Sequence, residues 1–417
     1  MEKFIIKGGK RLQGSVSAGG SKNAALPIIA ASLLVRGKTE LSNVPSLKDV
    51  RTMCDVLRVV GAKVYSENDR LLIDTSTCDH PAAPYELVKT MRASILVMGP
   101  LTASMSKARI SKPGGCAIGL RPVDQHLKGI RALGAQVDES HGYFDIKADR
   151  LKGAEIYMDE PSVTATENIV MAASMAEGKT IIHNAAREPH VVDLMNFLNK
   201  MGAKIENVGS DVLILEGVEE LHPVRYSICP DQIEADTFMV AAAITSGDVL
   251  IKNCSVEVSA SEVAKLREMG VSVEKEEGGV RVVSEGNLNA SYVKTLPYPG
   301  FPTDLQPQIT SLLTVARGTS MITEGMYEKR FTHVPELQRM GADIKIEGRN
   351  AIVNGVTRLG GAMVMASDIR AGAALVLAGL AAEGETHISR IYHIDRGYDH
   401  IEKKFELLGG DIKRVEE

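Results

Sequence analysis

The chain has 417 residues, of which 44% are hydrophobic and 24% are charged. This length exceeds what one ordinary hydrophobic core holds, so two domains are the expectation. The formal net charge is −5 with no basic tail, which argues against a nucleic-acid-binding protein.

The N-terminal residues 1–7 resemble neither a signal peptide nor a transit peptide. No apolar run approaches the roughly 20 residues that span a bilayer. The cysteines are odd in number, scattered and without a CxxC pair, and they are Cys54, Cys78, Cys116, Cys229 and Cys254. This pattern predicts reduced thiols in the cytoplasm, with no zinc site.

One element recurs along the chain: an amphipathic helix that ends at a glycine and is followed by a short strand. These glycines lie 68 to 73 residues apart and are Gly61, Gly134, Gly202, Gly270, Gly341 and Gly409. Glycine is the expected C-terminal cap because it adopts a left-handed conformation at little cost. Six units predict two domains of three units each. An open solenoid is the alternative, although solenoid repeats are usually shorter, about 20–50 residues.

Each unit also contains a second strand, a helix of small residues and a further strand. The helix expected at residues 371–377 is apolar nearly all round, which is typical of a buried helix. We therefore predict an α/β (α+β) protein: a two-domain inside-out α/β barrel with three mixed βαβαββ-type units in each domain.

The repeat also assigns the chain termini. The last unit stops after the strand at residues 409–413, and residues 4–8 have the pattern of its missing second strand. We expect the two terminal strands to pair. The predicted domains are residues 22–229, and residues 1–21 with 230–417.

Two loop positions of the repeat carry polar and charged residues. One is the start of the small-residue helix: Lys22, Asn23, Arg92, Asp236, Asp304, and Arg370 beside Asp368. The other precedes the glycine-capped helix: Arg121, Arg187 with Glu188, Arg330, and Arg396 beside Asp395. A single arginine is more simply a solvated surface charge. A set at equivalent positions predicts a cationic cleft between the domains, where helix N-termini also favour phosphate or carboxylate groups.

The segment 111–124 contains Pro113-Gly114-Gly115-Cys116, which predicts a mobile, exposed loop. A cysteine on such a loop near cations should have a depressed pKa and real reactivity. The other cysteines are interpreted as small buried residues. His126 could form a nucleophilic pair with Cys116, but it is expected on the following helix in a structural or substrate-contact role.

The segment 297–306 contains Thr303-Asp304-Leu305-Gln306, which has the form of a capping box that opens a helix. Asp304 would then lie in the first helical turn, where a carboxylate is stabilised. The functional alternative makes Asp304 a base for a substrate hydroxyl.

From end to end, the chain resembles the UDP-N-acetylglucosamine 1-carboxyvinyltransferases, a family of enolpyruvyl transferases in the EPSP synthase superfamily. The matching stretches are residues 21–27, 89–94, 113–124, 184–189, 301–304, 330–337 and 392–398. The resemblance implies a two-domain inside-out barrel, in agreement with the repeat. It also implies transfer of the enolpyruvyl group of phosphoenolpyruvate to the 3′-hydroxyl of UDP-N-acetylglucosamine, the first committed step of peptidoglycan synthesis.

The same resemblance implies roles for individual residues. Cys116 stands at the family's loop cysteine, the general acid that the epoxide fosfomycin alkylates, and Asp304 stands at the position of the base. Lys22 and Arg396 match further catalytic positions. The implied substrate-binding residues are Lys22, Asn23, Arg92, Arg121, Pro122, Val123, Asp124, Gln125, Ser162, Asp304, Met326, Arg330, Arg370 and Arg396. No metal or organic cofactor, nucleic acid or membrane is implied, and a cytoplasmic monomer is the expectation.

Glu160 and Thr164, on either side of Ser162, depart from the family, whose members can carry Lys and Gly there. Two other functions stay open at this point. One is the sister enzyme 5-enolpyruvylshikimate-3-phosphate synthase, and the other is a non-catalytic paralogue that binds the nucleotide sugar.

Overall fold

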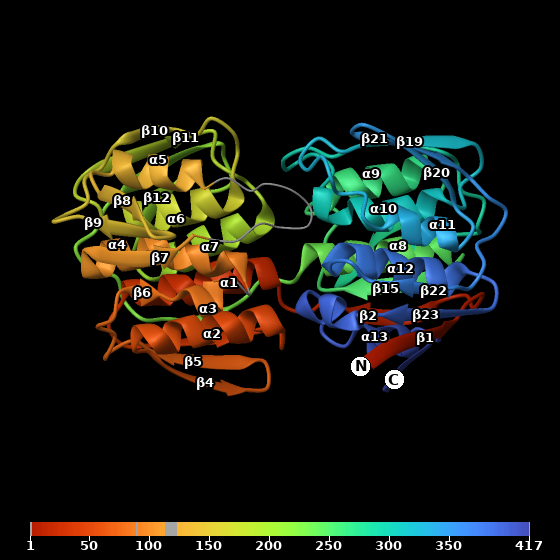
Figure 1. Ribbon diagram of the computed structural model, residues 1–417, viewed down its shortest axis with the longest axis horizontal. Helices are drawn as coiled ribbons and strands as arrows, with labels where there is room; N and C mark the ends of the chain where they lie inside the picture. Colours follow the sequence, from red (N-terminus) through yellow and green to blue (C-terminus); the bar gives the residue numbers. More distant parts are fainter. Residues whose placement is uncertain (1, 89–90, 113–122, 417) are drawn as a thin grey trace. The chain divides into compact units, whose positions relative to one another are not determined.

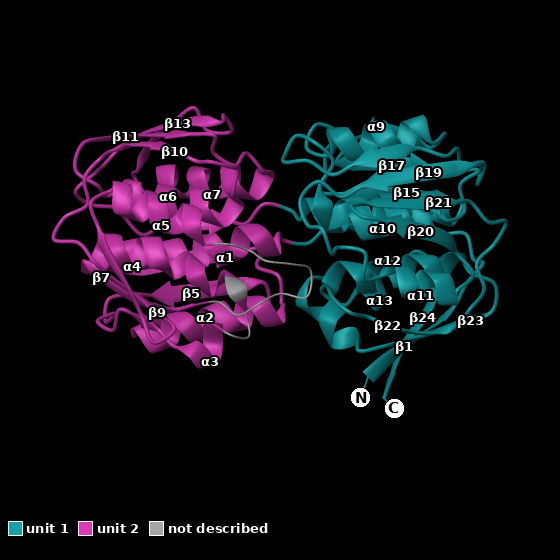
Figure 2. Ribbon diagram, turned by 45° about the horizontal axis from the view of Figure 1, so that its top comes forward, with its two compact units in different colours: residues 1–19, 117–119, 230–417 teal, residues 20–116, 120–229 magenta. Residues whose placement is uncertain are grey.

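The computed structural model describes residues 2–88, 91–112 and 123–416. The described chain divides into two compact units, coloured separately in Figure 2. Unit 1 comprises residues 2–19 and 230–416, and unit 2 comprises the described residues between 20 and 229.

Each unit repeats one module three times: a first strand, a buried helix, a central strand, an amphipathic helix and a β-hairpin (Figure 1). The first strands are β2 (Gln13–Ser17), β6 (Ala82–Ala83), β10 (Glu155–Tyr157), β14 (Arg225–Ser227), β18 (Tyr292–Lys294) and β22 (Met363–Met365). The central strands are β3 (Lys38–Ser42), β7 (Lys107–Ser111), β11 (Lys179–His183), β15 (Asp248–Lys252), β19 (Thr319–Thr323) and β23 (Glu385–Ser389). The module confirms the predicted mixed βαβαββ unit.

The hairpins complete a four-stranded sheet in every module. They are β4 (Lys63–Glu67) with β5 (Arg70–Asp74), β8 (Gln136–Ser140) with β9 (Tyr143–Lys147), β12 (Lys204–Glu206) with β13 (Val212–Glu216), β16 (Ser272–Glu276) with β17 (Gly279–Val283), and β20 (Asp343–Glu347) with β21 (Asn350–Asn354). In the sixth sheet the two terminal strands, β24 (Asp411–Glu416) and β1 (Glu2–Lys7), take the place of the hairpin. In each sheet the central strand pairs parallel with the first strand and antiparallel with the hairpin.

The chain termini meet in one sheet. Strand β1 pairs antiparallel with β24, placing Ile6 opposite Ile412, which confirms the predicted pairing of the terminal strands. Unit 2 closes in a similar way, because β14 pairs parallel with β3 and places Tyr226 opposite Leu41.

The small-residue helices form the centre of each unit, with the sheets outside them (Figure 1). They are α1 (Lys22–Ala31), α4 (Met98–Met105), α6 (Val163–Ala173), α8 (Gln232–Ile244), α10 (Gln306–Leu313) and α12 (Ile369–Ala381). Short 3₁₀ segments adjoin three of them: η1 (Ser32–Leu34), η2 (Arg92–Val97) and η3 (Thr303–Leu305). A side chain at Gly99 would place its Cβ 2.2 Å from the Asn168 carbonyl oxygen, so glycine permits the close contact of α4 with α6.

The amphipathic helices bury one face in each unit and expose the other. They are α2 (Lys48–Val60), α5 (Asp124–Ala132), α7 (Pro189–Lys200), α9 (Ala260–Glu268), α11 (Val334–Arg339) and α13 (Ile401–Leu407); α3 (Tyr85–Val88) and η4 (Ile391–Arg396) are additional short turns. The glycine after each amphipathic helix has a φ between +86° and +107°, which confirms the six predicted caps.

Hydrogen bonds to the backbone hold the two chain segments at residues 19–21 and 229–231. In unit 1, Asp231 N donates to Gly19 O at 2.8 Å, and Gly19 N donates to the Glu234 carboxylate at 2.7 Å. In unit 2, Ser21 N donates to Cys229 O at 2.8 Å. These contacts hold the chain directly before the first residues of α1 and α8. Across residues 2–88, 91–112 and 123–416, no helix is long and apolar enough to cross a membrane.

Candidate active site

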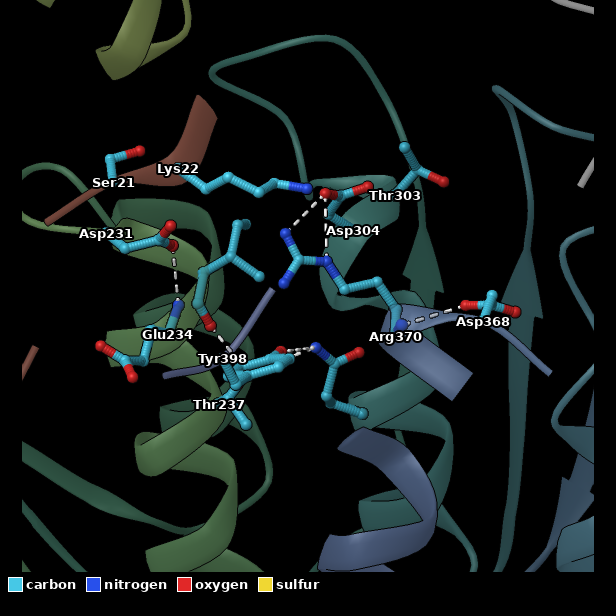
Figure 3. A network of polar contacts seen from close by, with 12 residues as sticks. Ser21, Lys22, Asp231, Glu234, Thr237, Thr303, Asp304, Asp368, Arg370 and Tyr398 are labelled. Carbon is cyan, nitrogen blue, oxygen red and sulfur yellow. Dashed lines mark hydrogen bonds and ion pairs between the residues drawn. The ribbon is translucent and has the colours of Figure 1, made fainter. Parts of the chain in front are cut away.

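In unit 1, the Asp304 carboxylate accepts hydrogen bonds from two buried arginines, Arg330 and Arg370. Figure 3 shows the contacts of Asp304 with Arg370. Arg330 Nη2 donates to Asp304 Oδ1 at 2.7 Å, while Arg370 donates to Oδ2 from Nη2 at 2.9 Å and from Nε at 3.2 Å. Both arginine side chains are 5% exposed, whereas the Asp304 side chain is 30% exposed. The carboxylate is therefore accessible to a ligand, whereas the two arginines that bind it are shielded from water.

The charge state of Asp304 follows from competing effects. Burial alone would raise the pKa of this carboxyl, but the charges of Arg330 and Arg370 outweigh burial and hold the pKa well below its usual value. Burial alone would lower the pKa of Arg370, but the Asp304 carboxylate outweighs burial and raises it. Asp304 is therefore an anion throughout the physiological pH range.

Thr303 and Glu324 extend this cluster. Thr303 Oγ1 donates to Glu324 Oε2 at 3.0 Å and accepts from Arg330 Nη1 at 3.0 Å. The predicted capping box is wrong, because α10 begins at Gln306 and its N-cap, Leu305, makes no side-chain cap hydrogen bond. The Thr303 hydroxyl instead accepts a hydrogen bond from Arg330, and Asp304 lies in the 3₁₀ helix η3.

Arg370 lies at the start of α12, whose N-cap is Asp368. Asp368 Oδ1 accepts from the backbone N–H groups of Arg370 and Ala371, both at 3.0 Å (Figure 3). The Arg370 guanidinium also lies 5.4 Å from the centre of the Tyr398 ring. The Tyr398 hydroxyl is 2.9 Å from Thr237 Oγ1 and accepts from Gln308 Nε2 at 3.0 Å, so a buried polar network supports the ring below Arg370.

Met326 and Arg396 are the other expected site residues of unit 1. Met326 is half-buried, and its backbone N–H donates to Glu324 Oε1 at 2.8 Å. Arg396 ends η4 and is half-buried. Its neighbour Asp395 pairs with Arg414 at 2.5 Å.

In unit 2, Lys22 and Asn23 open α1. Ser21 caps this helix, with its Oγ accepting from Ala24 N at 3.3 Å. The buried Lys22 ammonium lies 3.4 Å from Asp49 Oδ2, and Asn23 is half-buried. The helix start thus presents an ammonium group together with backbone N–H donors, an arrangement suited to an anion.

The residues expected to contact the nucleotide gather at the starts of α5 and α6. Asp124 is exposed, and Gln125 Nε2 donates to Asp124 Oδ2 at 3.2 Å and to Asp159 Oδ2 at 2.9 Å. Val123 and Ser162 are half-buried N-cap residues of these two helices. Val123, Asp124, Gln125 and Ser162 thus lie at the ends of two helices that pack together in unit 2.

Thr164, one of the departures from the family pattern, has a structural contact. His126 lies on α5 as predicted, and its Nε2 is 3.0 Å from Thr164 Oγ1. Its Nδ1 is 2.9 Å from Asn168 Nδ2, so both ring nitrogens are engaged. Glu160, the other departure, is exposed.

Cys116, Arg121 and Pro122 lie outside the described residues, as does the side chain of Arg92. Of the other cysteines, Cys54 and Cys78 are buried as expected, whereas Cys229 and Cys254 are half-buried. Burial raises the pKa of Cys54 and Cys78 to about 11 each and that of Cys254 to about 12. These three thiols stay protonated at neutral pH and should react slowly with alkylating agents.

Asp236 was expected among the charged residues of the cleft, and this expectation is wrong. Its side chain is fully buried within α8, next to Glu262, Ser259 and Asp231. Burial, reinforced by the Glu262 charge, raises the pKa of Asp236 well above its usual value, and burial also raises the pKa of Glu262. Asp236 is therefore a neutral core residue.

This buried pair predicts a pH-dependent stability. The folded-state pKa values of both carboxyl groups are raised. Their protonated forms therefore contribute fully to the free energy of unfolding below the unfolded-state pKa of about 4, and this contribution is lost as pH rises. In urea unfolding, as pH rises above about 4, we expect the free energy of unfolding to fall by up to about 1.4 kcal/mol per pH unit for one proton. Asp236→Asn should flatten this slope, whereas Glu277→Gln, at an exposed carboxylate of the same unit, should leave it unchanged. Equal slopes in wild type and Asp236→Asn would contradict the protonated state.

Sequence reasoning did not identify three residues that shape the site: Asp49, Thr303 as an arginine ligand, and Glu324. Asp49 lies in the first turn of α2, directly after a lysine, and resembles an ordinary helix-start carboxylate. Glu324 directly follows β19 and is fully buried. Burial of a charged residue is the signal that distinguishes it, and the sequence alone does not show that burial.

The chain is similar to proteins of a known family. The family model described as EPSP synthase (3-phosphoshikimate 1-carboxyvinyltransferase) matches residues 6–405. Proteins named UDP-N-acetylglucosamine 1-carboxyvinyltransferase from Desulfatibacillum aliphaticivorans and Geobacter metallireducens are 53% and 54% identical, each over 100% of both chains.

Solved structures show the same fold at low sequence identity. The enolpyruvyl transferase NikO from Streptomyces tendae has a TM-score of 0.88 at 24% identity, covering 99% of each chain. EPSP synthase from Acinetobacter baumannii has a TM-score of 0.78 at 19% identity, covering 100% of each chain. These matches confirm the predicted two-domain fold class, and with the full-length relatives they show that the chain belongs to the EPSP synthase family of enolpyruvyl transferases.

Proposed function

We propose that this chain transfers the enolpyruvyl group of phosphoenolpyruvate to the 3′-hydroxyl of UDP-N-acetylglucosamine and releases phosphate. The observation that carries the proposal is the set of relatives bearing that enzyme name, which are 52–54% identical over at least 99% of the chain. The reaction would be the first committed step of peptidoglycan synthesis in the cytosol. It uses two small-molecule substrates and no metal or organic cofactor.

The proposed reaction is an addition followed by an elimination. Cys116 donates a proton to C3 of phosphoenolpyruvate, and C2 acquires oxocarbenium-like character. The sugar 3′-oxygen then bonds to C2 while Asp304 accepts the hydroxyl proton. In the second step the proton transfers run in reverse: C3 returns a proton to the Cys116 thiolate, the C2–C3 double bond re-forms, and the C2–O bond to phosphate breaks as the leaving phosphate takes the proton from Asp304. The products are one enolpyruvyl ether and one inorganic phosphate.

The ion pairs of Asp304 bear on its role as a base. A carboxylate held by two guanidinium groups is ionised, as a proton acceptor must be, but it is a weak base. An anionic substrate that draws Arg330 or Arg370 toward itself would weaken one ion pair and raise the pKa of Asp304. Substrate binding would thus strengthen the base where it is needed.

Several cations must offset the repulsion between two anionic substrates. We propose Lys22, Arg121 and Arg396 as contacts to phosphoenolpyruvate, with Arg92, Arg330 and Arg370 as further cations. Asn23 would contact the amino sugar. The remaining proposed contacts, mainly to the nucleotide, are Pro122, Val123, Asp124, Gln125, Ser162 and Met326.

Phosphate release measures the function directly. Purified wild-type protein with phosphoenolpyruvate should release phosphate when UDP-N-acetylglucosamine is added, and not when shikimate 3-phosphate is added. Release with shikimate 3-phosphate alone would assign the activity named by the family model. Release with neither acceptor, alongside measurable binding of the nucleotide sugar, would indicate a non-catalytic paralogue.

A further inference from the structure

Glu324 is a fully buried carboxylate whose two oxygens have different partners. Oε1 accepts from Thr295 Oγ1 at 2.7 Å and from the backbone N–H groups of Met326 and Tyr327 at 2.8 and 3.0 Å. Oε2 accepts from Thr303 Oγ1 at 3.0 Å. The first set of contacts fixes the carboxylate in place, and the second directs it at the residue beside Asp304.

The contact between Glu324 and Thr303 determines how the threonine hydroxyl is oriented. A hydroxyl carries one proton and two lone pairs, and a guanidinium group only donates. Thr303 Oγ1 therefore accepts from Arg330 Nη1 at 3.0 Å through a lone pair, and its proton is left for Glu324 Oε2 at 3.0 Å. A hydrogen bond from a charged guanidinium group is stronger than one between neutral groups, so the contact of Arg330 with Thr303 is a strong one.

Arg330 depends on these contacts for its orientation. Its Nε is buried and has no hydrogen-bond partner among the residues that the structure describes. The guanidinium donates to Thr303 through Nη1 and to Asp304 through Nη2, and its centre lies 5.7 Å from that of the Tyr327 ring. Among the residues that the structure describes, loss of the Thr303 hydroxyl would leave the Arg330 guanidinium with one hydrogen-bond partner, Asp304.

We propose that Glu324 and Thr303 form a positioning relay that orients Arg330 and, through it, the Asp304 carboxylate toward the acceptor hydroxyl. The relay runs from Glu324 to Thr303, Arg330 and Asp304, and it rests on the proposed function. Arg370 binds Oδ2 of Asp304, and the relay positions Arg330, which binds Oδ1. Together the two arginines set the orientation of the carboxylate. Neither Glu324 nor Thr303 needs to exchange a proton with substrate.

Threonine-to-valine and threonine-to-serine variants separate positioning from packing. Thr303→Val keeps the side-chain shape and removes the hydroxyl, and we expect kcat to fall about 10- to 100-fold with little change in KM. Thr303→Ser restores the hydroxyl and should restore kcat. Thr319→Val removes an exposed hydroxyl from the strand that leads to Glu324, and it should leave kcat unchanged. An unchanged kcat in Thr303→Val, or a loss that serine does not rescue, would overturn the relay.

A double-mutant cycle tests whether Thr303 acts through Arg330. In an Arg330→Lys background, Thr303→Val should change kcat by less than about twofold, because the partner of the hydroxyl is already lost. Multiplicative effects of the two substitutions would overturn the relay. The same cycle in urea unfolding of the ligand-free protein should give a midpoint shift smaller than the sum of the single shifts. That readout needs no turnover, so failure of the relay can be distinguished from failure of the proposed function.

Discussion

Asp304→Asn should lower kcat by about 10² to 10⁴ while leaving the binding of UDP-N-acetylglucosamine largely intact. The amide keeps the size of the side chain but cannot accept the hydroxyl proton in the neutral range. The substitution also leaves Arg330 and Arg370, each 5% exposed, without their shared counter-charge. Because an uncompensated buried charge is costly, we expect a loss of about 3 kcal/mol in the free energy of unfolding.

The matched control for this variant is Asp248→Asn. Asp248 also forms a two-pronged pair with an arginine of unit 1, Arg281, at 2.8 and 2.9 Å, but the Arg281 side chain is 47% exposed. Exposed pairs contribute little, so this variant should retain full turnover and nearly full stability. Steady-state phosphate release, calorimetric titration with the nucleotide sugar and urea unfolding measure the three quantities. If Asp304→Asn loses sugar binding instead of turnover, Asp304 is a binding residue and not the base.

Cys116→Ser should lower kcat by a similar factor, about 10² to 10⁴, and should abolish covalent labelling by fosfomycin. A serine hydroxyl is a much weaker acid than a thiol, so protonation of the phosphoenolpyruvate methylene would slow. Labelling followed by mass spectrometry of peptides reports the nucleophile, and phosphate release reports the acid.

The other thiols provide an internal control for this labelling. Burial raises the pKa of Cys54, Cys78 and Cys254 to between about 11 and about 12, so wild-type protein at pH 7 should carry no adduct at these three positions. Cys54→Ser should leave turnover and labelling unchanged. Persistent labelling of Cys116→Ser, or a kcat within a few-fold of wild type, would remove Cys116 from the mechanism.

The sequence predicted those parts of the fold that depend on local patterning. A glycine at the end of an amphipathic helix requires a left-handed backbone, so the six caps could be placed from spacing alone. The terminal strands could be paired because the sixth unit lacked one strand. The short first strands were not located by residue, because segments such as Glu155–Tyr157 carry too few residues for a pattern and are defined by the strand they pair with.

For the candidate site too, the sequence predicted what depends on the repeat pattern and missed what depends on tertiary contacts. The positions of Asp304, Arg330 and Arg370 were predicted because charged residues recur at equivalent loops of the repeat. The contacts of Thr303 in this cluster were not predicted, because a threonine at the start of a helix has the pattern of a helix cap. In the structure its hydroxyl instead donates to Glu324 and accepts from Arg330. Asp236 occupies a loop-like position in the repeat, yet it is buried beside Glu262, a tertiary contact that residue spacing does not show.

One competition experiment tests the central claim, that this chain builds an enolpyruvyl ether on the 3′-oxygen of a nucleotide sugar by addition and elimination. Wild-type protein is incubated in D₂O with phosphoenolpyruvate and equal amounts of UDP-N-acetylglucosamine and shikimate 3-phosphate, and the products are followed by NMR. We expect inorganic phosphate and a single ether, on the 3′-oxygen of the amino sugar, with deuterium in its methylene group. An ether on shikimate 3-phosphate, or a nucleotide-sugar product free of deuterium, would contradict the account.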